Sequence, residues 1–294
     1  MRKNFIILTA VSLILFSCQK ENSIENGTNT IIVNTNADTL LKKFIVLDTT
    51  IAAPNDTVYK YTFAYDNLKR CTSYRASDGI DSFVIYNFFN GSDPNITHMK
   101  IYNLSSGDDS TFNYFTYSQT GKILTDSIIE YNPTGTAIFL LNYQNTTNQG
   151  GIITDISNGT QFEINKFSSL RDNGNIINIK DSLFRLIVTN YTLSVSANAD
   201  ISYDNKINPF YRIVPKHLVN VLLESSSIFT FPPFQSLPQK NNILMETKIF
   251  SPQNSGLDNY NNSLQYVYNS NNYPLIVRVR DLVNNKYYKG IYIY

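Results

Sequence analysis

Alternating aromatic and polar residues are the strongest pattern in this chain, and they predict β-strands. In the run from Tyr59 to Tyr65 every odd position is aromatic, whereas the even positions carry Lys, Thr and Ala. A period of two places the four rings on one face of a strand, because successive side chains point to opposite faces. Asp66 and Asn67 then break the run before a second strand at 70–74, so this segment predicts a β-hairpin.

The same unit of strand, polar turn and strand recurs along the chain at irregular spacing. Further copies occupy 112–124, 139–154 and 264–279, and 201–206 opens another. Short strands that alternate with turns rich in Asn, Ser, Thr and Gly favour an all-β fold. We therefore predict that residues 40–294 form an antiparallel sheet built from successive β-hairpins.

One segment departs from this pattern. Leu218, Val221 and Leu222 recur at helical spacing, and Pro215 before them suits the first turn of a helix. We predict one short helix near 215–224 that packs on the sheet, followed by an ordered loop at 229–238.

The N-terminal residues have the zones of a secretory signal. Arg2 and Lys3 precede an uncharged run at 5–16, which is shorter than the roughly 20 apolar residues that span a bilayer as a helix. The sequence Leu-Phe-Ser-Cys that ends at Cys18 resembles the lipobox of bacterial lipoproteins. That resemblance implies cleavage before Cys18 and acylation, including palmitate, of its thiol and new amine. Several acyl chains make a stable anchor.

This anchor divides the chain into three parts and indicates a location. Residues 1–17 are the predicted signal peptide, 18–39 the lipidated cysteine with a polar tether, and 40–294 the β-hairpin repeat domain. Gln19 follows the cysteine where lipoproteins of the inner membrane usually carry Asp, which favours the outer membrane. The sequence from Gln19 to Asn22 also resembles a short tag of surface-exposed lipoproteins, so display on the cell surface is a further expectation.

Charge and cysteine content limit the functions that remain. The chain has 24 Lys and Arg against 23 Asp and Glu, a formal net charge of +1. This balance argues against an electrostatic binder of nucleic acid or of anionic membranes, since either needs a basic excess on one face. Lipidation uses one of the two cysteines, so no disulfide framework is expected.

The repeated unit has a resemblance of its own. The pattern Tyr-x-Tyr-Asp/Asn, a turn, and then Lys/Arg-Ile/Leu resembles the tyrosine–aspartate (YD) repeat of RHS-type proteins. Residues 203–210 read Tyr-Asp-Asn-Lys-Ile-Asn-Pro-Phe, which is similar to a segment of small repeat-bearing bacterial lipoproteins of unknown function. The resemblance covers most of residues 40–294. It implies a sheet built hairpin by hairpin and has no catalytic residues to transfer.

Residue types that carry chemistry are few and scattered. Cys71 as a nucleophile would need a base, but only His98 and His217 are present and Cys71 lies within a predicted strand, where a small buried side chain is ordinary. Neither histidine has the further ligands of a zinc site. The acidic turns at 107–109 and 172–175 lack the ligand spacing of a calcium loop. We predict no catalytic residue, cofactor or metal.

The aromatic stripes and the last strand have two interpretations each. Flat rings can stack on sugars, but aromatic residues at a period of two more often form the covered face of a sheet. Gly290 to Tyr294 resembles the terminal aromatic strand of outer-membrane barrels. Spanning strands need about 9–11 residues, and the runs here are mostly shorter. We predict a closing edge or central strand of a soluble sheet.

These observations predict a non-enzymatic, lipid-anchored protein of the envelope or cell surface with a binding or structural role. Its partner would be a glycan, a peptide or an envelope protein, and not nucleic acid. The alternative is a surface hydrolase with a dispersed carboxylate site. A pocket with converging carboxylates of shifted pKa would favour the enzyme, whereas a broad exposed Tyr/Phe patch would favour binding.

Overall fold

The computed structural model of the protein describes residues 40–294 except 52–55, 106–109, 120, 133–134, 148–149, 158–159, 214–230, 232–233, 235–237 and 253–258. The predicted signal peptide, Cys18 and the tether lie outside the described residues. So do the helix predicted near 215–224, with His217, and most of the loop predicted at 229–238. No helix within the described ranges is long and apolar enough to cross a membrane.

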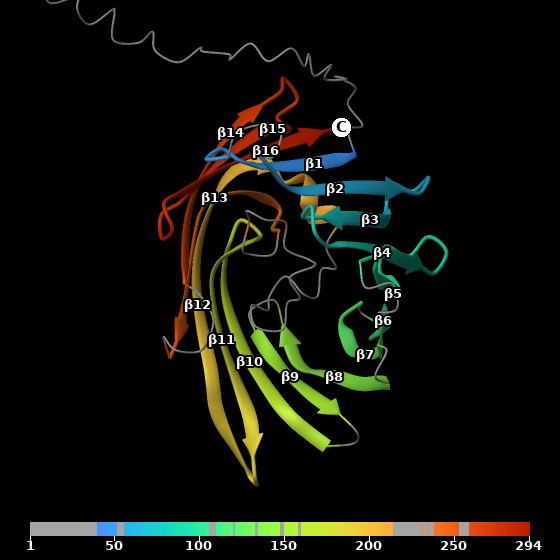
Figure 1. The fold of residues 1–294 in the computed structure, drawn as a ribbon. Helices are drawn as coiled ribbons and strands as arrows, with labels where there is room; N and C mark the ends of the chain where they lie inside the picture. Colours follow the sequence, from blue (N-terminus) through green and yellow to red (C-terminus); the bar gives the residue numbers. More distant parts are fainter. Residues whose placement is uncertain are drawn as a thin grey trace, which may run out of the picture. The chain divides into compact units, whose positions relative to one another are not determined.

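One antiparallel sheet of sixteen strands makes up the described part of the chain, and it closes into a barrel (Figure 1). The strands are β1 (Lys43–Asp48), β2 (Thr57–Tyr65), β3 (Cys71–Ser77), β4 (Ser82–Phe89), β5 (Ile96–Asn103), β6 (Ser110–Tyr117), β7 (Ile123–Asn132), β8 (Gly135–Thr147), β9 (Gly150–Ser157), β10 (Thr160–Asp172), β11 (Asn175–Ile187), β12 (Asn190–Ile207), β13 (Asn241–Ser251), β14 (Tyr260–Tyr268), β15 (Pro274–Asp281) and β16 (Lys286–Ile293).

Strand order around the barrel follows chain order, so each strand pairs with the next one. The prediction of an all-β, antiparallel sheet built from successive hairpins is therefore confirmed. Closure comes from β16, which pairs with both β15 and β1, with Ile293 opposite Lys43. Every strand therefore has two partners inside residues 43–293, and the sheet has no open edge.

The predicted aromatic face of β2 is the inner face of the barrel. Tyr61 and Phe63 are buried, at 3% and 8% exposure. The polar break after β2 forms the expected turn, since a carboxylate oxygen of Asp66 accepts hydrogen bonds from the backbone N–H groups of Leu68 and Arg70, both at 2.9 Å. The units at 112–124, 139–154 and 264–279 are also pairs of adjacent strands.

Several strands are longer than the apolar runs of the sequence. β8, β10 and β11 each have 13 residues, and β12 has 18. Hydrophobic patterning missed their polar ends, because strand pairing is made by backbone groups and continues through Asn, Ser and Thr. For the same reason 201–206 does not open a hairpin but forms the end of β12.

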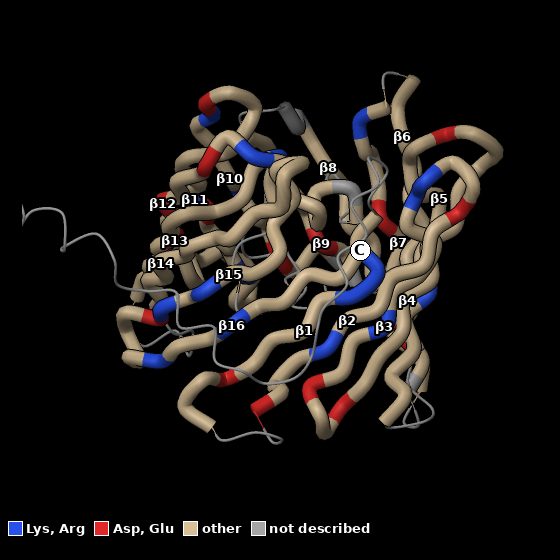
Figure 2. The backbone as a smooth tube through the Cα atoms, turned by 90° about the horizontal axis from the view of Figure 1, so that it is seen from above, with Lys and Arg blue, Asp and Glu red and all other residues tan. Residues whose placement is uncertain are grey.

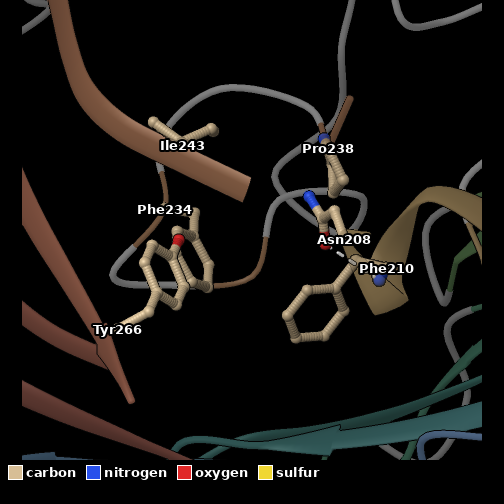
Figure 3. Close-up of a pocket in the computed structure, with 6 residues that line it drawn as sticks. All are labelled: Asn208, Phe210, Phe234, Pro238, Ile243 and Tyr266. Atoms are coloured by element: carbon tan, nitrogen blue, oxygen red, sulfur yellow. Dashed lines mark hydrogen bonds between the residues drawn. The ribbon is translucent and has the colours of Figure 1, made fainter. Parts of the chain in front are cut away.

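The Asn-Pro-Phe segment ends β12 and turns the chain into the barrel. Pro209–Arg212 is a 3₁₀ helix, and the Asn208 side-chain oxygen accepts a hydrogen bond from the backbone N–H of Phe210 at 3.0 Å (Figure 3). The Phe210 ring lies 4.4 Å from that of Phe231 and 5.0 Å from that of Phe44, measured between ring centroids. This segment therefore supplies the centre of an aromatic core.

The core leaves little free space at this point. A cavity of about 10 Å³ is lined by Asn208, Phe210, Phe234, Pro238, Ile243 and Tyr266 (Figure 3). One water molecule needs about 10–15 Å³ on the same measure. The cavity is therefore too small for a substrate.

Candidate binding surface

The outward side of β4 to β9 is an apolar and aromatic surface with little charge. Residues directly opposite each other on paired strands lie on the same face of the sheet. The strand registers therefore divide the residues of each strand into two sets, and the set that contains the buried core residues faces inward. Along these six strands, Lys100 is the only described outward residue with a formal charge. The remaining outward positions carry aromatic, aliphatic, hydroxyl and amide side chains.

Three rings form a stack across β4, β5 and β6. Phe88 pairs with His98, and His98 pairs with Tyr114. The first two rings are parallel to within 7° with centroids 4.2 Å apart, and the second pair is separated by 5.8 Å at 19°. Opposite Tyr114 on β7 is Ser127, which is small. The Tyr114 ring thus has a ring neighbour on one side only.

A second row of rings surrounds Lys100. Its ammonium lies 4.6 Å from the Tyr102 ring centroid and 4.7 Å from that of Phe112. Tyr102 in turn contacts Tyr86 edge to face, and Phe112 contacts Tyr131 in the same way. The charge of Lys100 therefore lies against aromatic faces, where a cation is stabilised by the ring quadrupole.

We call these eight residues together the aromatic wall. Its members are Tyr86, Phe88, His98, Lys100, Tyr102, Phe112, Tyr114 and Tyr131. Four of the rings are well exposed: 41% for Tyr86, 40% for Phe88, and 44% each for Tyr114 and Tyr131. Ile138 on β8, which shares a face with Ile129 beside Phe112, is 56% exposed and extends the apolar surface. Exposed apolar patches of this kind on a folded domain mark interaction sites.

The residues singled out for chemistry from the sequence do not come together. Cys71 is 2% exposed, and its thiol donates a hydrogen bond to the Ser73 carbonyl oxygen at 3.4 Å. Burial raises the pKa of this thiol to about 12, so it is not a thiolate near neutral pH. His98 belongs to the aromatic wall on the outer side. His217 lies outside the described residues.

The two acidic turns also carry no metal site that the structure describes. Asp108 and Asp109 lie outside the described residues. At 172–175 the chain makes the turn between β10 and β11, with Asn173 and Gly174 at positive φ. The side chain of Asn175 donates a hydrogen bond to the Asn241 oxygen at 2.8 Å, so this group serves the fold. Among the described residues, no group of three or more His, Cys, Asp or Glu could hold a metal ion.

Inward carboxyl groups with raised pKa occur on one ladder of the barrel. Asp126 and Asp155 flank Leu141 across β7, β8 and β9, and Glu163 follows on β10. Burial raises the pKa of Asp126 to about 7 and that of Asp155 to about 6. Asp126 is only 3% exposed, however, and Glu163 forms an ion pair with Arg185 at 2.7 Å. The ladder therefore does not offer an accessible pair for acid–base chemistry.

A second inward group of charges is equally enclosed. Glu246 and Asp181 are 0% and 1% exposed, and Lys248 is 7% exposed. The Asn262 amide donates a hydrogen bond to a Glu246 oxygen at 3.0 Å. Burial lowers the pKa of Lys248, while Asp181 and Glu246 act in the opposite direction. Such charges inside a barrel serve each other rather than a solute.

Sequence reasoning missed the aromatic wall, although a signal was present. Patterning assigned the aromatic residues to a covered face, which is correct for β2. In β4, Phe83 and Ile85 point inward, whereas Tyr86 and Phe88 point outward. Both faces of this strand are therefore apolar or aromatic. A one-layer barrel covers only its inner face, so a strand that is apolar on both faces must expose one of them. That pattern was the signal for an outer binding surface.

Comparisons with known proteins add limited information. No family model matches the sequence, and no curated protein matches it. The fold is similar to a porin-like protein from Bacteroides vulgatus ATCC 8482, at 12% identity and a TM-score of 0.49 over 87% of this chain and 99% of that chain. A porin-like protein from Bacteroides uniformis ATCC 8492 gives 12% identity and a TM-score of 0.43 over 86% and 95%. At these values the similarity assigns neither a family nor an activity.

Proposed function

We propose that this chain is a lipid-anchored envelope protein that binds a glycan on the aromatic wall and catalyses no reaction. The observation that carries the proposal is the exposed aromatic surface on β4 to β7, beside which the described residues place neither an accessible pair of carboxylates nor a metal-binding group. A pocket with converging carboxylates would favour a hydrolase, whereas a broad exposed Tyr/Phe patch favours binding, and this surface is of the second kind.

The chemistry of the wall matches a sugar better than a globular apolar partner. Rings such as Tyr114, whose second side is free of other rings, accept the C–H face of a sugar. Beside them on the same face lie Thr116 and Thr125, whose hydroxyl oxygens are 2.6 Å apart, and Asn142. Hydroxyl and amide groups around an aromatic platform supply the hydrogen bonds that sugar hydroxyls need.

The wall faces water rather than lipid in this proposal. The neighbouring strands β10, β11 and β12 carry Lys166, Lys180 and Asp200 at exposed outward positions. A lysine on the lipid side at the bilayer midplane costs roughly 2–4 kcal/mol. We therefore place the barrel beside the membrane, with the acyl chains at Cys18 as its anchor and the outer membrane as its location.

The test is binding of residues 19–294 to an array of glycans, peptides and envelope proteins. We expect a glycan to bind, and Phe88→Ala combined with Tyr114→Ala to weaken that binding by at least about tenfold, because a few large rings carry most of a binding energy. Leu170→Ala combined with Ile249→Ala is the matched control, since both side chains are exposed on strands away from the wall, at 60% and 52%.

Three results would contradict the proposal. A glycan that binds equally well to the wall variant does not use the wall. Selective capture of a peptide or envelope protein on the wall would replace the glycan as the partner. Turnover of an arrayed glycan that is lost in Asp155→Asn would establish the hydrolase instead.

A further inference from the structure

The outward side of β14 to β3 is basic. Its cations are Lys43, Lys60, Arg75, Arg278, Arg280 and Lys289. The strand carboxylates in this part of the barrel are Asp48 and Asp281, and both belong to the inward set: Asp48 is 8% exposed and Asp281 lies opposite the buried Asn262. Figure 2 shows the basic residues along β15, β16, β2 and β3. We call the six outward cations the basic face.

The centre of the basic face holds like charges directly opposite one another. Arg278 on β15 pairs in register with Lys289 on β16, and Arg280 is two residues further along β15. Neither arginine nor the lysine forms an ion pair with a described residue. Like charges in opposite positions on paired strands destabilise a sheet. The Arg280 guanidinium lies 5.6 Å from the Tyr287 ring centroid, but no described carboxylate pairs with these three cations. An arrangement that costs stability and has no described counter-charge points to an anionic partner.

Three acidic residues at nearby strand ends, Asp66, Asp78 and Asp281, are engaged by hydrogen bonds within their own turns. Asp66 accepts hydrogen bonds from the Arg70 side chain and backbone. Asp78 accepts from the backbone N–H groups of Ile80 and Asp81 within its own turn. Asp281 similarly accepts from Val283 and Asn284. Each carboxylate is engaged locally at a strand end.

We propose that the basic face docks on the anionic headgroups of a lipid bilayer. The face extends over β15, β16, β1, β2 and β3 of a continuous barrel wall, which suits a broad charged surface rather than a small ion. The choice of a lipid surface rests in part on the proposed anchor at Cys18, which would hold the barrel next to a membrane. A lipid anchor and a basic patch together give stable attachment where one signal alone is weaker.

The basic face is not apparent from the net charge of the chain, because positive and negative residues are nearly equal in number. The formal net charge of +1 argued against an anionic-membrane binder. On β14 to β3, however, the cations face outward while the strand carboxylates face inward. The criterion of a basic excess on one face is therefore met without a basic excess in the composition.

Binding of residues 19–294 to vesicles tests the inference independently of the anchor, because this polypeptide lacks Cys18. We expect it to sediment with vesicles of equal parts phosphatidylcholine and phosphatidylglycerol, and not with phosphatidylcholine alone. Binding should fall steeply as salt rises from about 50 to about 300 mM, because surface charges are screened. Replacing Arg278, Arg280 and Lys289 together with Gln should weaken binding by at least about tenfold, with the melting temperature unchanged or raised.

The matched control replaces Lys122, Lys166 and Lys180 with Gln, which changes net charge equally at exposed positions away from both the basic face and the aromatic wall. This variant should keep its binding to within about twofold. Failure to bind anionic vesicles, or equal losses in both variants, would overturn the inference. Competition by soluble glycerol phosphate as effective as that by vesicles would show a site for free phosphate instead. None of these results bears on glycan binding by the aromatic wall, so the two proposals fail separately.

Discussion

At the scale of single residues, Asp126 makes the stability of the barrel depend on pH. Its carboxylate is buried on the inner side of the barrel and accepts two hydrogen bonds from the Asn113 amide, at 3.0 and 3.2 Å. Burial outweighs these bonds and raises its pKa to about 7, whereas an unfolded Asp has a pKa of about 3.9. Between these values the folded state holds a proton that the unfolded state has lost. Stability therefore falls as pH rises from about 4 to about 7, and the cost is complete above that range.

Asp126→Asn should remove the part of this pH dependence that comes from Asp126, and the smaller part from Asp155 should remain. The amide carries no charge and can still accept a hydrogen bond from Asn113. We expect the free energy of unfolding at about pH 8 to increase, on the order of 2 kcal/mol, with little change at about pH 4. Urea unfolding at both pH values measures the difference.

Asp81→Asn is the control for this measurement, because Asp81 is an exposed turn residue. It should leave the pH dependence of the parent protein unchanged. An Asp126→Asn variant that is less stable than the parent at about pH 8 would show that the ionised carboxylate is favourable in its site.

At the scale of elements, tyrosine hydroxyl groups tie neighbouring strands together in a repeated way. A tyrosine at or near the end of a strand donates a hydrogen bond of 2.8–2.9 Å to a backbone carbonyl oxygen within two residues of the beginning of the preceding strand. The pairs are Tyr65 with Leu41, Tyr117 with Ile96, Tyr203 with Ile176, and Tyr294 with Pro274. The regular use of this contact explains the recurrence of Tyr in the sequence unit.

The residue after such a tyrosine organises the following backbone. Asp66 and Asp204 each accept a hydrogen bond from the backbone N–H two residues ahead, at 2.9 and 2.8 Å. After Tyr117, the Ser118 hydroxyl oxygen accepts from the backbone N–H of Lys122 at 3.1 Å. Short side chains with an oxygen acceptor favour turns for this reason. Tyr followed by Asp thus combines a strand tie with an acceptor for the next backbone N–H groups. At Asp66 this acceptor stabilises the turn after β2, whereas Asp204 lies within β12.

Tyr117→Phe should test the strand tie. Removing the hydroxyl leaves the Ile96 carbonyl without this donor, so we expect a loss of about 1 kcal/mol in the free energy of unfolding. Tyr114→Phe on the same strand is the control, because that ring lies on the exposed aromatic wall, and it should cost less than about 0.5 kcal/mol. Chemical denaturation of both variants gives the comparison. Equal stabilities of the two variants would contradict a role for the tie.

Whether a feature of these elements could be predicted from the sequence depends on how far apart along the chain the interacting residues are. The hairpin at 59–74 was predictable because alternation and turn residues are local. The tie from Tyr65 to Leu41 was not, since it joins residues 24 positions apart. The aromatic wall was not predicted either, because a pattern tells which residues share a face but not which face is covered. Pairing of β4, β5 and β6 puts Phe88 and Tyr114 on one face, and only the curvature of the whole barrel makes that face the outer one.

At the scale of the whole molecule, the sequence predicted an antiparallel sheet but not a barrel. Closure depends on β1 meeting β16, and hydrophobic alternation within each strand is the same for an open or a closed sheet. The strand resembling a terminal barrel strand, Gly290 to Tyr294, does close the sheet. Its inward Tyr292 is 2% exposed and packs on Phe44, so the aromatic residues of this strand fill the interior.

The anchor is tested on the full chain. Cys18→Ala should abolish labelling by a radioactive fatty acid, and the protein should leave the membrane fraction or accumulate as an uncleaved precursor. The reason is that the thiol is the only acyl acceptor from which the proposed processing begins. Cys71→Ala is the control and should be labelled like the parent. A Cys18→Ala protein that is still processed and membrane-bound would refute the anchor.

The pairing of β1 with β16 also fixes the order of events when the protein is made. Synthesis proceeds from the N-terminus, so residue 43 is made long before its partner, residue 293. Until Lys286–Ile293 emerges, β1 has an edge of unpaired backbone groups, and so does the most recently formed hairpin. Such edges attract other strands and promote aggregation, and contacts this distant in sequence form slowly. A newly made chain must therefore remain separated from other copies until Lys286–Ile293 has paired with β1.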